Sequence, residues 1–268
     1  MGIFSFLQRW LLYHLTLPLE DFRNIRYFRF CIPWIVKITP RTTSTEAHAL
    51  RFLHSSGLEL PIPRLITAFV HSSTTYTVMA RLPGERLVDA MQRETFSRED
   101  LDNIVAEVWA VLVKLQTLRQ PAYLAGKVML SASGHDLPEP LSFFEERSGP
   151  FSSILELWRY AGSFGSMAEM RQYVAQDLLD ALEADPIRYV HPDLRTYNII
   201  VRDGHLSGII DWEDSGWYPS AWQVHAMRYR RFGCLGEWHK YWKEQHRFSP
   251  VAEAAYDASA TFLMKSPV

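Results

Sequence analysis

Two short apolar runs in the last third of the chain are joined by a dipeptide that favours tight turns. The runs cover residues 199–201 and 206–210, and Asp203–Gly204 lies between them. Asp-Gly is among the strongest signals for a two-residue hairpin turn, because both positions of that turn need positive φ angles. In an antiparallel hairpin, the residue before the first strand lies near the residue after the second. The pattern therefore predicts that Asn198 and Asp211 meet at the open end.

The polar residues around this hairpin suit phosphate chemistry. The segment His191-Pro-Asp193-Leu-Arg-Thr-Tyr-Asn198 leads directly into the first strand. Two carboxylates and one amide oxygen at a strand end suit Mg²⁺, which binds oxygen ligands and shares them with nucleotide phosphates. Phosphoryl transfer also needs a group that orients the attacking hydroxyl. We expect Asn198 and Asp211 to hold the metal, Asp193 to accept the hydroxyl proton, and His191 to brace the loop.

These motifs resemble the catalytic loop and the metal-binding aspartate of the protein-kinase-like fold. Ile210-Asp211-Trp212-Glu213 replaces the Asp-Phe-Gly of protein kinases and is closer to the aminoglycoside phosphotransferase and choline kinase branch. Asp214-Ser-Gly-Trp217-Tyr-Pro219 continues as in fungal-type phosphotransferases. The order and spacing of the motifs cover roughly residues 30 to 245.

The resemblance implies an α+β bilobal fold. Residues 1–82 would form a small β-rich lobe that binds nucleotide, and residues 83–268 a larger, mainly helical lobe with the catalytic and substrate-binding groups. The implied cofactors are ATP and Mg²⁺. The implied reaction moves the γ-phosphate to a hydroxyl of a small metabolite or antibiotic-like compound, in a cytoplasmic enzyme. The sequence gives no indication of oligomeric state.

The resemblance extends to the first third of the chain. Lys37 lies in the apolar segment 34–38 and looks like the strand lysine that contacts ATP. Glu46 looks like the helix glutamate that pairs with it. The backbone of Met79, Ala80 and Arg81 resembles the hinge that hydrogen-bonds adenine.

Acidic and aromatic residues after Asp211 are candidates for contact with the acceptor. Glu213 and Asp214 are suited to a cationic substrate, and Trp217 is suited to lining an acceptor pocket. Each has an ordinary alternative, because acidic side chains are commonly solvated and tryptophans at this density are commonly part of a core. Both interpretations stay open at this point.

Hydrophobic periodicity divides the chain into a strand-rich first third and a helical remainder. The predicted strands cover residues 25–30, 34–38, 64–69 and 75–79, and the predicted helices cover 47–53, 99–118, 151–159, 167–183 and 221–243. The segment 120–150 is rich in Pro, Gly and Ser, and we expect a long loop there.

The first seventeen residues are unusually apolar, but they lack the basic start and small-residue cleavage site of a secretory signal. We expect a short helix at about residues 1–17 that covers the smaller lobe, with contact to a membrane surface as the less favoured alternative. No stretch of about 20 apolar residues predicts a transmembrane helix. The net charge of −2 argues against nucleic acid as a partner.

One departure from the kinase pattern leaves alternatives open. There is no glycine between Gly2 and Gly57, so the glycine-rich loop that covers the phosphates in protein kinases is missing. A catalytically silent kinase fold that serves as a binding module is therefore one alternative. A kinase-fold enzyme with other chemistry, such as nucleotidyl transfer in a biosynthetic pathway, is the other.

Overall fold

The computed structural model describes residues 2–19, 22–137, 149–228, 234, 236–245 and 247–263, and the chain forms two compact units. The first unit contains residues 1–107 and 199–213, and the second contains residues 108–198 and 214–268. The predicted lobe boundary between residues 82 and 83 stays a prediction. No helix among the described residues combines the length and the hydropathy needed to cross a bilayer.

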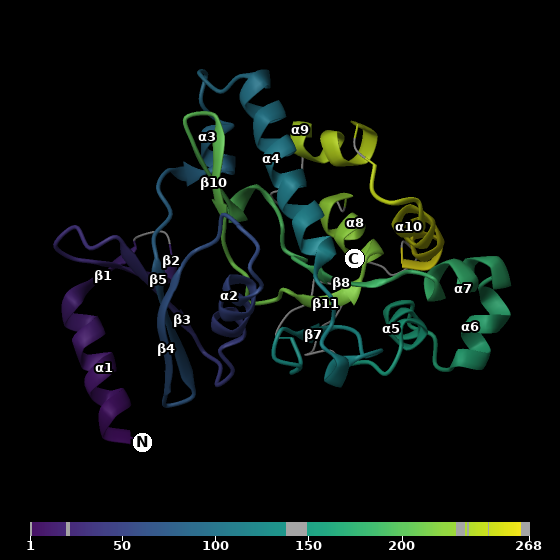
Figure 1. Ribbon diagram of the computed structural model, residues 1–268, viewed down its shortest axis with the longest axis horizontal. Coiled ribbons are helices and arrows are strands. Elements are labelled where there is room, and N and C mark those ends of the chain that lie inside the picture. The colour runs from purple at the N-terminus through teal and green to yellow at the C-terminus, as the bar shows by residue number, and fades with distance from the viewer. Residues whose placement is uncertain are drawn as a thin grey trace. The chain divides into compact units, whose positions relative to one another are not determined.

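The first unit is built on a five-stranded antiparallel sheet with strand order β1-β2-β3-β5-β4 (Figure 1). Its strands are β1 (Thr16–Leu19), β2 (Phe22–Phe28), β3 (Trp34–Thr39), β4 (Leu65–His71) and β5 (Thr74–Ala80). This confirms the strands predicted in the first third and adds β1. The expected helix over residues 1–17 is α1 (Gly2–Leu15), so it ends two residues early, where Thr16 begins β1.

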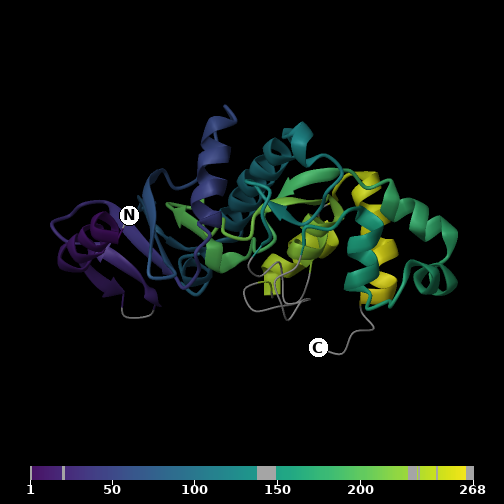
Figure 2. The same cartoon turned by 90° about the horizontal axis from the view of Figure 1, so that it is seen from below.

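Two helices flank this sheet, with α1 on one face and α2 (Thr45–Ser55) on the other (Figures 1 and 2). Successive side chains of a strand point to opposite faces, so neighbours on β3 meet different helices. Val36 packs in a cluster with Leu12 of α1, whereas Lys37 pairs with Glu46 of α2. The alternation therefore buries an apolar side chain on one face and presents a lysine on the other.

The predicted hairpin forms as β9 (Ile199–Arg202) and β10 (His205–Ile209), in antiparallel register from Ile199 opposite Ile209. Asp203 and Gly204 have φ angles of 53° and 76°, as a type I′ turn requires. The short strand β6 (Glu85–Arg86) joins β9 to complete a second sheet, and α3 (Leu87–Ala90) follows it.

Helix α4 (Arg98–Thr117) and a glycine hold this second sheet in place. The Glu107 carboxylate of α4 accepts a hydrogen bond from the backbone N–H of Leu206 at 2.5 Å and pairs with the His205 ring at 2.8 Å. Gly84 has a φ of 107°, and a Cβ there would lie 2.1 Å from the Val201 carbonyl oxygen. Only glycine therefore permits this close approach to β9.

The second unit combines a small sheet with helices. The sheet has strand order β7 (Leu130–Ser131), β11 (Gly216–Pro219) and β8 (Ile187–Val190). The helices are α5 (Ile154–Ala161), α6 (Met167–Tyr173), α7 (Gln176–Glu183), α8 (Ala221–Arg228), α9 (Gly236–Lys240), the π-helical turn Tyr241–Gln245 and α10 (Pro250–Leu263). Short 3₁₀ turns cover Ala122–Leu124 and Thr196–Asn198.

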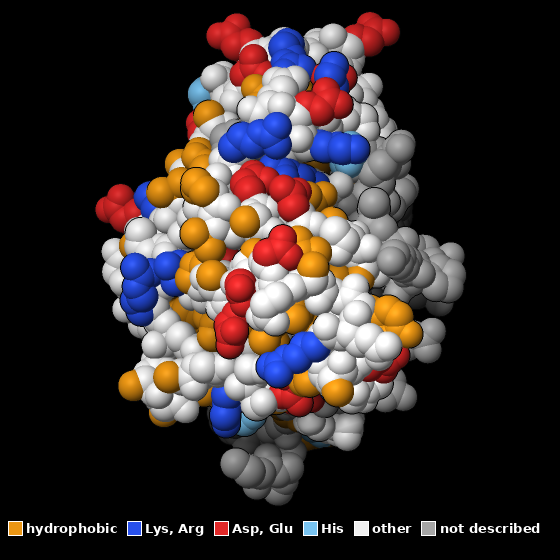
Figure 3. Space-filling model, turned by 90° about the vertical axis from the view of Figure 1, so that its right-hand side faces the viewer, with side chains coloured by type: hydrophobic (Ala, Val, Ile, Leu, Met, Phe, Trp, Pro, Cys, Tyr) orange, Lys and Arg blue, Asp and Glu red, His pale blue; other side chains and the backbone are white. Residues whose placement is uncertain are grey.

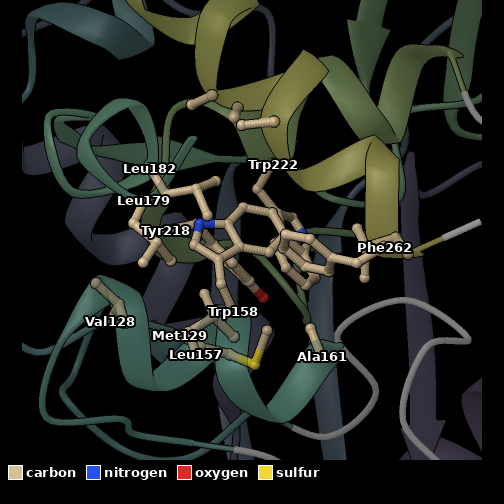
Figure 4. Close-up of a cluster of buried hydrophobic side chains, with 14 of the residues drawn as sticks. Val128, Met129, Leu157, Trp158, Ala161, Leu179, Leu182, Tyr218, Trp222 and Phe262 are labelled. Carbon is tan, nitrogen blue, oxygen red and sulfur yellow. The ribbon is translucent and has the colours of Figure 1, made fainter. Parts of the chain in front are cut away.

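The core of the second unit is centred on tryptophans of α5 and α8 (Figure 4). The rings of Trp158 and Trp222 lie 5.3 Å apart between centroids, and Tyr218 stacks on Trp222 at 5.7 Å. Fully burying aromatic side chains of this size contributes more to stability than burying any other residue type. Helices from distant parts of the chain are thereby joined in one apolar cluster.

Some predicted element boundaries in this unit are wrong. The single helix expected over 167–183 is interrupted because Val174 and Ala175 adopt extended backbone, with Val174 buried in the core. The helix expected over 221–243 ends at Arg228, and residues 229–233 and 235 lie outside the described residues. The loop expected over 120–150 contains β7, while residues 138–148 also lie outside the described part.

A buried histidine of α8 makes the stability of the fold sensitive to acid. Burial, with a smaller contribution from Arg228, lowers the pKa of His225 from 6.5 to about 3. The folded state therefore keeps this ring neutral while the unfolded state takes up a proton below pH 6.5. The neutral ring therefore costs the folded state nothing above pH 6.5. Below that pH the free energy of unfolding falls, by about 2 kcal/mol at pH 5.

When the pH falls from 7.5 to 5, the free energy of unfolding should decrease by about 2 kcal/mol less in the His225→Gln variant than in the unaltered protein. Glutamine retains a polar group for Ser259, whose hydroxyl lies 2.7 Å from His225 Nε2. Urea unfolding at the two pH values measures the difference. The same change at the exposed His54 is the control for the substitution itself. Identical pH dependence in all three proteins would contradict the prediction.

Candidate active site

Three acidic side chains of the first unit converge on Lys37 of β3. Its ammonium lies 2.6 Å from Asp211 Oδ1, 3.2 Å from Glu46 Oε2 and 3.3 Å from Glu213 Oε1. Lys37 and Glu46 are buried, while about a third of the Asp211 side chain is exposed. The predicted pairing of Lys37 with the α2 glutamate is therefore present, and the ammonium also contacts the residue expected to bind metal.

The electrostatics of this cluster follow from one buried cation among three carboxylates. Burial by itself would lower the pKa of Lys37, but Glu46, Asp211 and Glu213 together raise that pKa well above its ordinary value. Burial raises the pKa of Glu46 to about 7, with Asp211 and Glu213 adding to the shift and Lys37 opposing it. Lys37 therefore stays protonated, and the three carboxyl groups around it outnumber this one ammonium group.

The backbone at Asp211 is held in an uncommon conformation. Asp211 has a φ of 64°, in the left-handed region that aspartate tolerates better than most side chains. The next residue fixes this bend: Trp212 is fully buried, its ring N–H donates to the Ile209 carbonyl at 2.8 Å, and its backbone N–H donates to Glu46 at 3.3 Å. Strained backbone of this kind is often found at functional sites.

Glu213 is neutralised from two sides. Lys37 lies against one of its oxygens, and Arg41 Nη1 lies 3.5 Å from the other. Arg41 is a member of this site that the sequence pattern did not single out, because an arginine just after a strand is an ordinary surface residue. The geometry gives Glu213 the role of a local counter-ion, and its predicted contact with a cationic substrate stays a prediction.

The catalytic-loop residues lie together in the second unit. Asn198 Nδ2 donates to the Asp193 carboxylate at 2.6 Å and to the Asp193 carbonyl at 2.8 Å, which leaves the amide oxygen of Asn198 for another partner. Arg195 Nε lies 3.3 Å from Asp193 Oδ1. The sequence did not single out Arg195. About a fifth of the Asp193 side chain is exposed, so the carboxylate is oriented but accessible.

The remaining predicted residues of this unit have different environments. His191 is buried, and its backbone is clamped by Gln223 of α8, whose side chain accepts from the His191 N–H at 3.0 Å and donates to its carbonyl at 3.2 Å. Trp217 is fully buried on β11, edge-on to Tyr189 at 5.2 Å, and thus belongs to the core. Asp214 is partly exposed, and its carbonyl accepts from the Tyr218 hydroxyl.

The predicted hinge lies at the end of β5, which includes Met79 and Ala80 but not Arg81. The backbone N–H of Ala80 donates to the Arg64 carbonyl and that of Arg81 to the Pro33 carbonyl, at 2.9 and 2.8 Å. Their amides are therefore occupied, and only carbonyl oxygens are left for a ligand. The next amide belongs to Leu82, which has no hydrogen bond to any other described residue. Residue spacing did not reveal this donor, because it depends on which neighbouring amides the sheet uses.

Removing the cation of the Lys37 cluster should strongly destabilise the first unit. In the Lys37→Met variant the carboxylate of Glu46 would stay buried without a counter-charge, which typically costs about 3–5 kcal/mol. Protonation of Glu46 relieves this cost, so the loss should be larger at pH 8 than at pH 6. Urea unfolding at both pH values measures it, with the exposed Lys127→Met as control. Adding Glu46→Gln should recover part of the loss, and no recovery would contradict the prediction.

Comparison with known proteins identifies the family. The sequence model of the phosphotransferase enzyme family matches residues 22–225, which is most of the chain. No curated protein matches it in sequence. Among solved structures, the streptomycin–ATP ternary complex of APH(2'')-IIa matches with a TM-score of 0.54 and 15% identity, covering 97% of this chain and 86% of that chain.

Two other solved structures match over nearly their whole length. An aminoglycoside 3'-phosphotransferase of type VIII has a TM-score of 0.54 and 17% identity, with 96% of this chain and 98% of that chain covered. APH(3'')-Id from Streptomyces rimosus has a TM-score of 0.52 and 16% identity, with 98% and 99% covered. These likenesses confirm the predicted kinase-like α+β fold. Together with the family match, they show that this chain belongs to the phosphotransferase enzyme family.

Proposed function

We propose that this phosphotransferase moves the γ-phosphoryl group of ATP, with Mg²⁺, to a hydroxyl group of a small molecule. The main support is that the Lys37 ammonium contacts both Glu46 and Asp211, at 3.2 and 2.6 Å. These residues come from β3, from α2 and from the segment just after β10, and no feature of the core requires three charges there. A buried lysine braced by a glutamate is suited to binding nucleotide phosphates.

The nucleotide would be held at two places in the first unit. Lys37 would contact phosphate oxygens while Glu46 keeps its ammonium in place. The purine would accept a hydrogen bond from the Leu82 N–H and donate to a carbonyl of the 79–81 segment, since the Ala80 and Arg81 amides are already used. The ATP-bound APH(2'')-IIa complex, which shares the fold, supports a nucleotide as the phosphoryl donor.

The chemistry of Asp211 and Asn198 fits a magnesium ion. Both offer oxygen atoms, which are the ligands that Mg²⁺ prefers, and few protein ligands suffice because nucleotide phosphates and water supply the others. The hydrogen bond from Asn198 Nδ2 to Asp193 directs the amide oxygen of Asn198 away from that carboxylate. When bound, the ion would neutralise negative charge on the phosphate oxygens.

Asp193 would orient the acceptor hydroxyl and take its proton. The Asn198 amide and the Arg195 guanidinium fix its carboxylate from two sides while leaving it accessible. A general base needs a defined position within hydrogen-bond reach of the reacting hydroxyl. His191, whose backbone is clamped by Gln223, would keep the start of this loop in place.

The acceptor is proposed by class, as a hydroxyl-bearing small molecule. The structural neighbours are named for aminoglycosides, which carry several hydroxyl and amino groups, so these compounds are the first panel to test. Glu213 and Asp214 are the acidic candidates for binding an amino group of the acceptor, and Glu213 is also paired with Lys37 and Arg41.

Calorimetric titration with ATP, with and without Mg²⁺, tests the proposal without knowledge of the acceptor. We expect binding that Mg²⁺ strengthens. No binding in either condition, from protein shown to be folded by circular dichroism, would overturn the proposal in favour of a silent binding module.

Mass spectrometry of the acceptor panel then distinguishes the possible reactions. A product that gains a phosphoryl group supports the proposal, whereas a product that gains AMP would identify a nucleotidyl transferase. ATP that binds with Mg²⁺ but is cleaved to ADP without any acceptor product would show an active nucleotide site and direct the search to other hydroxyl compounds.

A further inference from the structure

Helix α1 presents an apolar face to solvent. Leu12 is buried against the five-stranded sheet, whereas large side chains elsewhere on the helix are about half exposed. These are Phe6 (53%), Leu7 (50%), Trp10 (52%) and Leu11 (48%). At 100° per residue they fall on one side of the helix, in i, i+4 pairs, opposite Leu12. A surface helix usually presents polar side chains to solvent, whereas the solvent-facing side of α1 is apolar.

The helix is fixed on the sheet in this orientation. The Ser5 hydroxyl lies 3.1 Å from His71 of β4, and Arg26 of β2 donates to the Thr16 hydroxyl at 2.7 Å and to the Thr16 carbonyl at 3.0 Å. Contacts at both ends prevent the helix from rolling to bury its outer face. The exposed apolar side chains thus belong to a rigid surface.

The charges around this face are cationic. Among the described residues, 2–19 include Arg9 and no acidic residue, and 24–30 add Arg26 and Arg29 and again no acidic residue. Arg9 is exposed at the edge of the helix nearer the sheet, 5.4 Å from the ring of Tyr13, and its side chain also interacts with Tyr76 of β5. At the end of the helix the Leu15 carbonyl accepts from the N–H of Arg29, and the next residue, Phe30, is 80% exposed.

We propose that α1 and the adjacent 29–30 turn dock the protein on an anionic lipid surface. Exposed Phe, Leu and Trp side chains flanked by arginine are the composition of helices that lie in the interface of a bilayer. A second copy of the chain fits less well, because α1 offers no acidic side chain to pair with the arginine of a symmetry-related α1. On the face shown in Figure 3, by contrast, acidic and basic side chains are interspersed.

In this arrangement the helix lies parallel to the membrane and does not cross it. Trp10 and Leu11 would enter the boundary between headgroups and acyl chains, and Arg29 would contact lipid phosphates. The affinity combines burial of apolar area with attraction to anionic lipid, so both contributions are needed.

Co-sedimentation of the full chain with vesicles tests the proposal. One set of vesicles contains phosphatidylcholine alone, and the other also contains about 30% phosphatidylserine, which makes its surface strongly anionic. We expect the protein to partition at least about tenfold more strongly to the anionic vesicles, and Leu11→Glu to remove most of this binding. The matched control is Tyr123→Glu, which adds the same charge at a side chain that is 74% exposed in the second unit. It should bind as the unaltered protein does.

Trp10 supplies a second readout. All nine tryptophans lie within the described residues, and among them only Trp10 is exposed. Its emission should shift to the blue on anionic vesicles, and Trp10→Phe should bind while losing the shift. Binding that Leu11→Glu leaves unchanged, no binding to either vesicle, or a dimer in solution that Leu11→Glu dissolves would each overturn the proposal. ATP titration of the variants separates this test from that of the proposed function.

Discussion

Replacing Asp193 by asparagine should lower kcat about a thousandfold while leaving the affinity for ATP nearly unchanged. Asparagine has the same size and retains an oxygen that accepts from Asn198, but it cannot take up the proton of the acceptor hydroxyl. The effect should therefore fall on the chemical step and not on nucleotide binding. Turnover is measured as ADP release with the best acceptor of the panel, and affinity by calorimetric titration.

The control for this variant is Asp203→Asn, at the exposed hairpin turn, where asparagine also tolerates the positive φ of 53°. It should leave both turnover and affinity unchanged. A loss of ATP affinity in Asp193→Asn as large as the loss of turnover would contradict the role of Asp193 as the base. Full activity of the variant would do so as well.

Replacing Asp211 by asparagine should weaken ATP binding by about ten- to a hundredfold when Mg²⁺ is present, and much less when it is absent. The φ of 64° at this position is accessible to asparagine, so the backbone bend is expected to persist. The substitution removes the charge that attracts the metal ion. It also removes the partner that lies 2.6 Å from Lys37, which frees the ammonium for phosphate.

The two aspartate variants are informative as a pair. Asp193→Asn should change turnover alone, whereas Asp211→Asn should change the magnesium dependence of binding and turnover together. Calorimetry at several Mg²⁺ concentrations measures this dependence, and thermal unfolding without ligand shows whether each variant is folded. Equal effects of both variants on metal-dependent binding would contradict the separate roles assigned to them.

Elements whose causes are local could be predicted from neighbouring residues alone. The hairpin followed from Asp203–Gly204, since only residues that tolerate positive φ can form its turn. Strand β3 and helix α2 followed from their periodicity, and the resemblance drawn from Lys37, Glu46 and the motif around Asp193 led to the family that the comparison then confirmed. In each case a few neighbouring residues carry enough information to specify the local structure or the motif.

Features that depend on contacts between distant segments could not be predicted in this way. The break at Val174 follows from its burial in the core, and strand β11 forms only because β7 and β8 pair with it. The charge of the Lys37 cluster likewise depends on Glu213 and Arg41, 172 positions apart in the sequence.

The same holds for the two surfaces on which the proposals rest. The amide of Leu82 is available because its neighbours are bonded to Arg64 and Pro33, and the apolar face of α1 is exposed because contacts with the sheet hold the other face inward. Hydrophobic periodicity shows that a helix has an apolar side, but the side that meets the protein is chosen by the free energy of packing over the whole unit.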